Sequence, residues 1–228
     1  KRVTVDYHRN CVELVSGDFR LAVTTEVGPR IIGGFIGGSA NLFRVMPNVA
    51  FSGADTGFRL YGGHRLWHSP EALPRSYAPD NDPVEVAPIA KGFEFRNAPE
   101  ALTGLQKAIA VEALGKNRFQ VTHRLTNVGQ WAIEVAPWAL SVMAPGGMAI
   151  VPQQRNPKHG NPFAPDRSLV LWPYSSFADP RLTCGDRYFL LGQDPAATGP
   201  CKIGFNCEPD WIAYANAGTA LVKHFEHF

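Results

Sequence analysis

The feature that most constrains the fold is a succession of short segments in which β-branched and aromatic residues alternate with polar ones. Such period-two alternation is typical of antiparallel strands, because successive side chains point to opposite faces of a sheet. The 22 glycines and 19 prolines separate these segments along the whole chain, as turns do between strands. We expect strands at 3–7, 19–27, 84–90, 93–96, 118–127, 131–143, 168–172, 187–192 and 219–228.

Helical patterning is scarce in this sequence. The best helical candidate, 99–114, is interrupted by Gly104 and alternates after Gln106, so we expect a turn followed by a strand. Strands joined by turns, with almost no amphipathic helix, predict an all-β fold: a large two-sheet antiparallel β-sandwich. No internal repeat or low-complexity linker divides the chain, so we expect one domain over residues 1–228.

Two long stretches, 44–83 and 144–167, lack a strand pattern and are expected to be irregular. Irregular segments of this length within a compact domain are usually functional or disordered. The second stretch brings Gln153, Gln154, Arg155 and His159 close together in sequence. We therefore regard both stretches as candidate ligand-binding segments, with Gln153 as a candidate substrate-binding residue.

Composition excludes several classes of function. The net charge of +2, without a basic run, argues against a nucleic-acid partner, and no apolar run is long enough for a membrane partner. Phosphate-binding loops, nucleophile elbows and His-Glu-x-x-His helices are absent from the sequence.

The sequence leaves the compartment and the oligomeric state open. Reduced, partly buried thiols are expected at Cys11, Cys184, Cys201 and Cys207.

The segment Gly57–Glu71, GFRLYGGHRLWHSPE, concentrates chemically versatile side chains. His64 and His68 titrate near neutral pH, Arg65 carries five donors, and Trp67 offers a flat apolar surface. This mixture suits a sugar, whose hydroxyl groups need directional partners while its C–H face stacks on a ring. The alternative is a packed loop in which Arg65 pairs with Glu71 and Trp67 holds the segment down.

The His64–His68 spacing matches two metal ligands on one helix, but Gly62–Gly63 and Pro70 leave no room for a helix. We therefore expect no metal, and no motif requires a cofactor. If a strand begins at Phe58, alternation places Phe58 with His64 on one face and Tyr61 with Arg65 on the other.

Three further residues are site candidates because of their positions in strands. His123 shares a face with Val121 and Leu125, where a core histidine is the alternative interpretation. Lys223 shares a face with Leu221, and an inward ammonium needs a partner or a cleft. Arg30 follows Gly28–Pro29, where it reaches a site or is solvated.

Three segments of the chain resemble the aldose 1-epimerase-like (galactose mutarotase-like) superfamily. FRLAVTTEVGPRIIGGFIGGSANLF is similar to the first hairpin of these proteins, and VTHRLTNVGQWAIEVAPWALSVMAPGG is similar to their strand, Leu-Thr-Asn, turn and strand segment. KIGFNCEPDWIAYANAGTALVKHFEHF resembles the closing strands of an uncharacterised branch. The resemblance implies a supersandwich with a carbohydrate-accommodating cleft on a concave sheet face.

In that family a histidine is the general acid on the ring oxygen and a glutamate is the general base on the anomeric hydroxyl. Here Pro137-Trp138 occupies the region of the family's histidine, and the late-strand pattern stops at Phe228 without a turn, compatible with truncation at the carboxyl terminus. A replacement pair would combine His64 or His68 with Lys223 or Glu226.

We therefore expect a protein that binds a hexose or uronate, with epimerase-like acid–base catalysis as one possibility. The predicted catalytic residues are His64, His68, Lys223 and Glu226, and the predicted substrate-binding residues are Arg30, Arg65, Trp67, His123 and Gln153. The main alternative is a non-catalytic carbohydrate-binding or structural module without the acid–base pair. A third possibility is an interaction domain with no small-molecule site.

Overall fold

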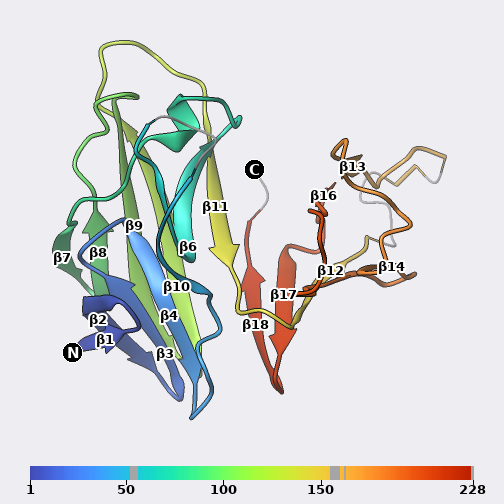
Figure 1. Ribbon diagram of the computed structural model, residues 1–228, viewed down its shortest axis with the longest axis horizontal. Coiled ribbons are helices and arrows are strands. Elements are labelled where there is room, and N and C mark those ends of the chain that lie inside the picture. Colours follow the sequence, from blue (N-terminus) through green and yellow to red (C-terminus); the bar gives the residue numbers. More distant parts are fainter. Residues whose placement is uncertain (52–55, 155–159, 162, 227–228) are drawn as a thin grey trace. The chain divides into compact units, whose positions relative to one another are not determined.

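The structure is a computed structural model that describes residues 1–51, 56–154, 160–161 and 163–226. Its residues group into two compact units, 1–143 and 144–228 (Figure 1). Every strand pair named below is antiparallel. The expected antiparallel all-β fold is therefore confirmed. The single domain over 1–228 stays a prediction, because one domain or two can contain two such units.

The first unit contains a seven-stranded sheet with the order β1-β2-β3-β4-β6-β11, in which β5 also pairs with β6. Its strands are β1 (Arg2–Val5), β2 (His8–Ser16), β3 (Phe19–Thr24), β4 (Arg30–Ile36), β5 (Val45–Ala50), β6 (Arg59–Ser69) and β11 (Ala136–Val142). A short 3-10 helix, η1 (Arg75–Tyr77), follows β6.

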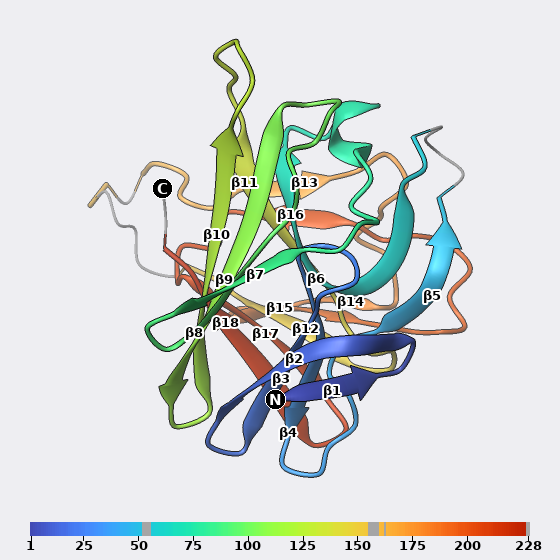
Figure 2. The same cartoon turned by 90° about the vertical axis from the view of Figure 1, so that its left-hand side faces the viewer.

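A second, four-stranded sheet has the order β10-β9-β8-β7 (Figure 2). It consists of β7 (Glu85–Ile89), β8 (Gly92–Arg96), β9 (Leu105–Gly115) and β10 (Arg118–Asn127). The Ser16 hydroxyl donates to the Arg118 carbonyl at 2.8 Å, and the Phe19 and Phe119 rings lie 5.4 Å apart. The two sheets therefore face each other as a sandwich.

Apolar side chains fill the space between these sheets. Val23 and Ile31 of the larger sheet and Phe95, Ile109 and Val111 of the smaller one are buried. Inward residues of β10 are half-buried at every second position from Phe119 to Leu125. This alternation confirms the strand expected at 118–127 and the shared face of His123 with Val121 and Leu125.

The second unit has a five-stranded sheet of order β14-β15-β12-β17-β18 and a two-stranded sheet of β13 and β16. The strands are β12 (Met148–Pro152), β13 (Leu169–Leu171), β14 (Leu182–Cys184), β15 (Tyr188–Gly192), β16 (Ile203–Phe205), β17 (Trp211–Asn216) and β18 (Thr219–His224). Among the described residues of this unit, only Pro152 and Tyr214 are buried. Side chains of the second unit are thus far more accessible than those of the first.

The expected irregular stretches are the main error in the fold prediction. The stretch 44–83 contains β5 and the eleven-residue strand β6, and the stretch 144–167 contains β12. Eight successive residues of β6, from Tyr61 to His68, are buried. A strand covered on both faces lacks the apolar–polar alternation by which exposed-face strands are recognised.

The other expected elements agree with the structure apart from their ends. The segment 99–114 is a turn followed by β9, as expected. The expected strand at 131–143 begins only at Ala136, and the one at 219–228 ends at His224, with residues 227–228 outside the described part. All four cysteines are described and are thiols, with Cys11 buried and Cys184 exposed. Within the described residues, no helix is long and apolar enough to cross a membrane.

Candidate functional site

Strand β6 lies inside the larger sheet, between β4 and β11. Arg30 of β4 is the register partner of Arg65, and Ser141 and Trp138 of β11 are the register partners of His64 and Trp67. Side chains opposite one another in register point to the same face of a sheet. The register therefore sorts the site candidates of β6 into two groups on opposite faces.

Two glycines allow neighbouring strands to approach β6 closely. Gly62 and Gly63 have φ angles of +78° and +69°, in the left-handed region. A Cβ atom at Gly62 would lie 1.9 Å from the Arg44 carbonyl oxygen, and one at Gly63 would lie 2.3 Å from the Ile31 carbonyl oxygen. Any larger residue would collide with backbone at both positions, so these glycines are structurally required.

The alternation of side chains holds within β6 but does not extend to Phe58. Arg65 lies over the Phe58 ring at 4.7 Å, and the Phe58 and Trp67 rings are 5.5 Å apart. Phe58 therefore lies on the Arg65 side, and its expected place with His64 is wrong. Tyr61, whose ring contacts the Arg30 guanidinium, lies on the Arg65 side as expected. Phe58 precedes Arg59, the first residue of β6, so the period-two rule of a strand does not apply to it.

On the inner face, which points toward the smaller sheet, His64 meets residues from two other strands. Its Nε2 lies 2.7 Å from Nε2 of His123 on β10, and its Nδ1 lies 2.7 Å from the hydroxyl oxygen of Ser141 on β11. His64 is buried, whereas His123 is half-buried. The result is an imidazole pair that connects the two sheets.

His68 also points to the inner face, two pleats along β6 from His64. Burial lowers its pKa, the Lys107 ammonium lowers it further, and Glu100 opposes this shift. Lys107 and Glu100 are buried and form an ion pair. Nδ1 of His68 has no hydrogen-bond partner among the described residues. His68 is thus a buried, neutral imidazole beside a buried ion pair.

On the outer face, Arg30 and Arg65 converge on Asp80. Asp80 Oδ2 lies 2.8 Å from Arg30 Nη2 and 3.2 Å from Arg65 Nη2, and all three side chains are buried. Burial alone would raise the pKa of the Asp80 carboxyl, but the two guanidinium groups lower it below its usual value. Burial lowers the pKa of Arg65 to about 9 while Asp80 opposes this, so both partners are charged at neutral pH.

Aromatic rings and backbone complete this outer cluster. The Arg65 guanidinium lies 4.5 Å from the Trp67 ring centre, and that of Arg30 lies 5.3 Å from the Tyr61 ring centre. Arg30 also donates to the Gly62 carbonyl at 2.8 Å.

The alternative pairing of Arg65 with Glu71 is wrong, because Arg65 pairs with Asp80. Glu71 accepts a 2.5 Å hydrogen bond from the Tyr77 hydroxyl. Burial, and then this hydrogen bond, raise the pKa of Tyr77 to about 12.

The first-unit candidates therefore do not converge on a single cleft. His64, His68 and His123 lie between the sheets, whereas Arg30, Arg65 and Trp67 lie on the opposite side of β6 and are buried. The interpretation of Gly57–Glu71 as a loop is wrong for Arg59–Ser69, which is strand β6. The packing alternative holds for Trp67, whose ring contacts those of Phe58, Tyr77 and Trp138.

Three other candidates, Lys223, Glu226 and Gln153, belong to the second unit. Lys223 is half-buried on the Leu221 face of β18, as expected, and burial lowers its pKa to about 8. Glu226 follows β18 and is exposed. The pairing of either residue with His64 or His68 stays a prediction. Arg155 and His159 lie outside the described residues.

Gln153 lines a shallow depression in the second unit. This depression has a volume of about 470 Å³. The Gln153 amide accepts from Arg167 Nη1 at 2.7 Å and donates to the Gly185 carbonyl. Its lining residues are Gln153, Pro165, Asp166, Arg167, Leu169, Cys184 and Phe189.

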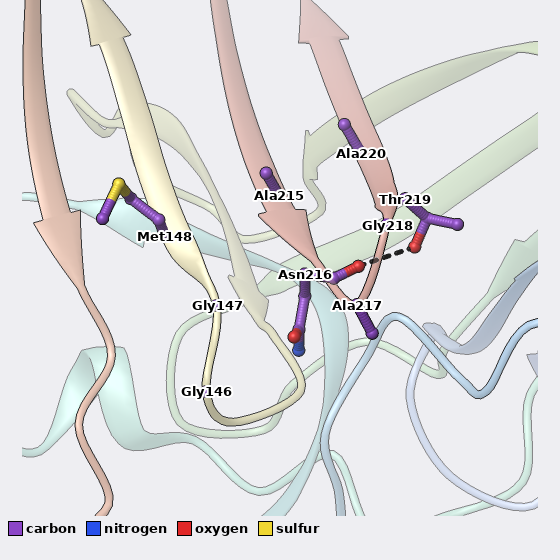
Figure 3. A pocket seen from close by; sticks show the side chains of 9 residues that line it. All are labelled: Gly146, Gly147, Met148, Ala215, Asn216, Ala217, Gly218, Thr219 and Ala220. Atoms are coloured by element: carbon purple, nitrogen blue, oxygen red, sulfur yellow. Dashed lines mark hydrogen bonds between the residues drawn. The ribbon is translucent and has the colours of Figure 1, made fainter.

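Another depression, of about 490 Å³, lies where the β17–β18 hairpin approaches the start of β12 (Figure 3). Gly146, Gly147, Met148 and the hairpin residues 215–220 line it. The hydrogen bond drawn there runs from the Thr219 hydroxyl to the Asn216 carbonyl, at 2.9 Å. None of these lining residues has an ionisable side chain, so this depression supplies no acid–base group.

The sequence interpretation missed four functional groups around β6: Asp80, Glu100, Lys107 and Ser141. Lys107 carried a usable signal, since it alternates with Leu105 and Ile109 and is therefore an inward lysine of the kind noted at Lys223. Ser141 could be found only from the β6–β11 register, and Asp80 only from the path of the chain after β6.

Within the described residues, no group of three or more His, Cys, Asp or Glu side chains is placed to hold a metal ion.

The chain was compared with protein-family models, curated proteins and solved structures, and none of them matches it. The chemistry of the His64–His123 pair is therefore the basis for any functional conclusion.

Proposed function

We propose that the protein binds a carbohydrate at the β10–β11 edge of the first-unit sandwich and that His64 and His123 exchange protons with the bound sugar. The observation that carries this proposal is the 2.7 Å contact between the two Nε2 atoms. At that separation one nitrogen holds a proton and the other accepts it. Imidazoles are the side chains best suited to donate and accept protons near neutral pH.

The difference in burial between the two imidazoles supports this role. His64 is enclosed between the sheets and is held from its other nitrogen by Ser141, whereas His123 is half-buried on β10. β10 is the last strand of the smaller sheet and β11 the last strand of the larger one. A ligand at this edge would contact His123 first, and His64 would serve as its buried proton partner.

The chemistry that we propose is ring opening and reclosure of an aldose, as the resemblance to the aldose 1-epimerase-like superfamily implies. A base removes the proton of the anomeric hydroxyl, an acid protonates the ring oxygen, and the bond from the anomeric carbon to the ring oxygen breaks. Reclosure on the other face of the aldehyde reverses these transfers and gives the other anomer. One imidazole pair that accepts and returns a proton is sufficient for this cycle.

The uronate alternative, proton abstraction next to a carboxylate, has less support. It would use Arg65 and Lys223 to supply positive charge. Arg65 lies on the other face of β6 and is paired with Asp80, and Lys223 belongs to the second unit. We therefore favour a neutral hexose over a uronate as the ligand class.

A thermal-shift screen against neutral hexoses, hexose phosphates and uronates tests the binding proposal. A ligand that binds only the folded state raises the melting temperature, and we expect this for a neutral hexose. His123→Ala should remove the shift, whereas Thr122→Ala, which changes the neighbouring exposed side chain of β10, should retain it. If no sugar of any class shifts the wild-type protein, carbohydrate binding is wrong.

Exchange between anomers, followed by NMR of the sugar, tests the catalytic part. We expect the wild-type protein to accelerate exchange and His64→Gln to reduce the acceleration by about 10²-fold, within the range that general acid–base catalysis contributes. A sugar that binds with no acceleration of exchange would contradict the catalytic proposal and leave binding intact.

The second candidate function is non-catalytic carbohydrate binding, and one observation favours it. Trp131, in the connection between β10 and β11, is 80% exposed, and an exposed indole is a flat surface for the C–H face of a sugar. In that case Trp131→Ala would remove the thermal shift, while His64→Gln would leave it unchanged. The acid–base proposal predicts no such loss from Trp131→Ala.

A further inference from the structure

The Ser141 hydroxyl is placed to control which nitrogen of His64 carries the proton. Ser141 and His64 are register partners on β11 and β6, so their side chains leave the sheet side by side on the same face. The hydroxyl oxygen lies 2.7 Å from Nδ1, and Nε2 on the other side of the ring lies 2.7 Å from His123. Both nitrogens of His64 are therefore engaged by groups that can either donate or accept a proton.

Two proton arrangements satisfy both contacts when each imidazole is neutral. In the first, Nε2–H of His64 donates to Nε2 of His123, and Nδ1 of His64 accepts from the Ser141 hydroxyl. In the second, Nε2–H of His123 donates to Nε2 of His64, and Nδ1–H of His64 donates to the Ser141 oxygen. His123 consequently carries its proton on Nδ1 in the first arrangement and on Nε2 in the second.

A hydroxyl group is compatible with both arrangements because it rotates. A carboxylate in its place would accept only, and would select the second arrangement. An alanine would remove this bond, and with it the group that serves both positions of the His64 proton. Among these three groups, the hydroxyl alone serves both arrangements equally.

We propose that Ser141 is a positioning residue that keeps both tautomers of His64 accessible, so that His64 and His123 form a reversible proton relay. The relay is a property of this chain alone, and its catalytic use rests on the proposed function. During turnover, starting from the second arrangement, Nδ1 of His123 would take the proton of the anomeric hydroxyl while its Nε2–H passes to Nε2 of His64. His64 then carries both protons, donating from Nε2 to His123 and from Nδ1 to the Ser141 oxygen, and the reverse transfers return one proton to the sugar and restore two neutral imidazoles.

The test is NMR of imidazole nitrogens in protein labelled with ¹⁵N histidine, without sugar and near pH 7.5. We expect averaged signals from both tautomers of His64 in the wild type. Ser141→Asp should place the His64 proton on Nδ1 and the His123 proton on Nε2. Ser141→Ala should favour the Nε2–H tautomer of His64, the one that imidazole prefers in water, and Ser141→Thr should restore the wild-type pattern.

The matched control is Thr122→Ala, which removes a hydroxyl beside His123 on the exposed side of β10 and should leave the signals unchanged. The proposal is overturned if Ser141→Ala and Ser141→Asp both keep the wild-type tautomers, or if His64 in the wild type is doubly protonated at this pH. Ser141→Ala alone decides the matter if Ser141→Asp does not fold.

Two sugar measurements separate this proposal from the proposed function. If a hexose binds, Ser141→Ala should leave its thermal shift intact and slow anomer exchange by about tenfold or more, a part of what acid–base catalysis contributes. Tautomers that respond as expected in a protein that binds no sugar would overturn the proposed function and leave the relay standing. Tautomers that stay fixed in a protein that binds sugar would overturn the relay and leave the proposed function standing.

Discussion

On the outer face of β6, two guanidinium groups converge on one buried carboxylate, whereas on the inner face a pair of imidazoles meets a hydroxyl. Arg65 and Asp80 are charged at neutral pH and pair with each other. His64 and His123 each have ring nitrogens that can donate or accept a proton. Ionic groups therefore stabilise this strand from its outer face, whereas the proton transfer that we propose would use the inner-face groups, which both donate and accept protons.

The largest effect is expected from Asp80→Asn, which keeps the shape of the side chain and removes its charge. Two buried guanidinium groups would lose their counter-charge, and breaking a buried ion pair in this way costs about 3–5 kcal/mol of folding free energy. Urea denaturation measures the loss. As a control, Glu85→Gln breaks the exposed contact with Arg96 and should have little effect, because exposed ion pairs contribute little. Equal effects of the two substitutions would refute a stabilising role for the outer cluster.

A smaller effect is expected from pH, through His68 on the inner face. Burial lowers its pKa in the folded protein, so as pH falls below about 6.5 the unfolded chain takes up the proton first. The free energy of unfolding should therefore decrease between pH 7.5 and 5.5, by at most about 1.4 kcal/mol per pH unit for this group. Urea denaturation at several pH values measures this decrease, and His68→Gln should make it smaller. A part of the decrease should remain in this variant, because burial also lowers the pKa of His8.

The smallest effect on stability is expected from His123→Gln. The side chain is half-buried and glutamine keeps a hydrogen-bonding group, so the free energy of unfolding should change by about 1 kcal/mol or less, as for a typical hydrogen bond. Chemical denaturation of this variant, compared with Asp80→Asn, tests the separation of roles most directly. A loss as large as that of Asp80→Asn would mean that the imidazole pair also holds the two sheets together.

Sequence patterns were sufficient where one face of a strand is accessible. Alternation from Phe119 to Leu125 fixed both the strand β10 and the direction of His123, and the same reasoning placed Lys223 beside Leu221. The period-two rule failed at β6, because both faces of this strand are buried. Its polar side chains pair with residues that are distant in the sequence. The rule failed again at Phe58, because that residue precedes the first residue of β6.

The sequence by itself determined the all-β class, the antiparallel strands and the concentration of chemically versatile side chains in Gly57–Glu71, since these follow from local periodicity and residue chemistry. Tertiary structure alone decided which of its side chains act together. Successive residues of a strand point in opposite directions, so His64 and Arg65 are neighbours in sequence and separated in space. Their partners, Ser141, His123 and Asp80, come from strands and turns up to 77 residues away, and only the register of the sheets brings them into contact.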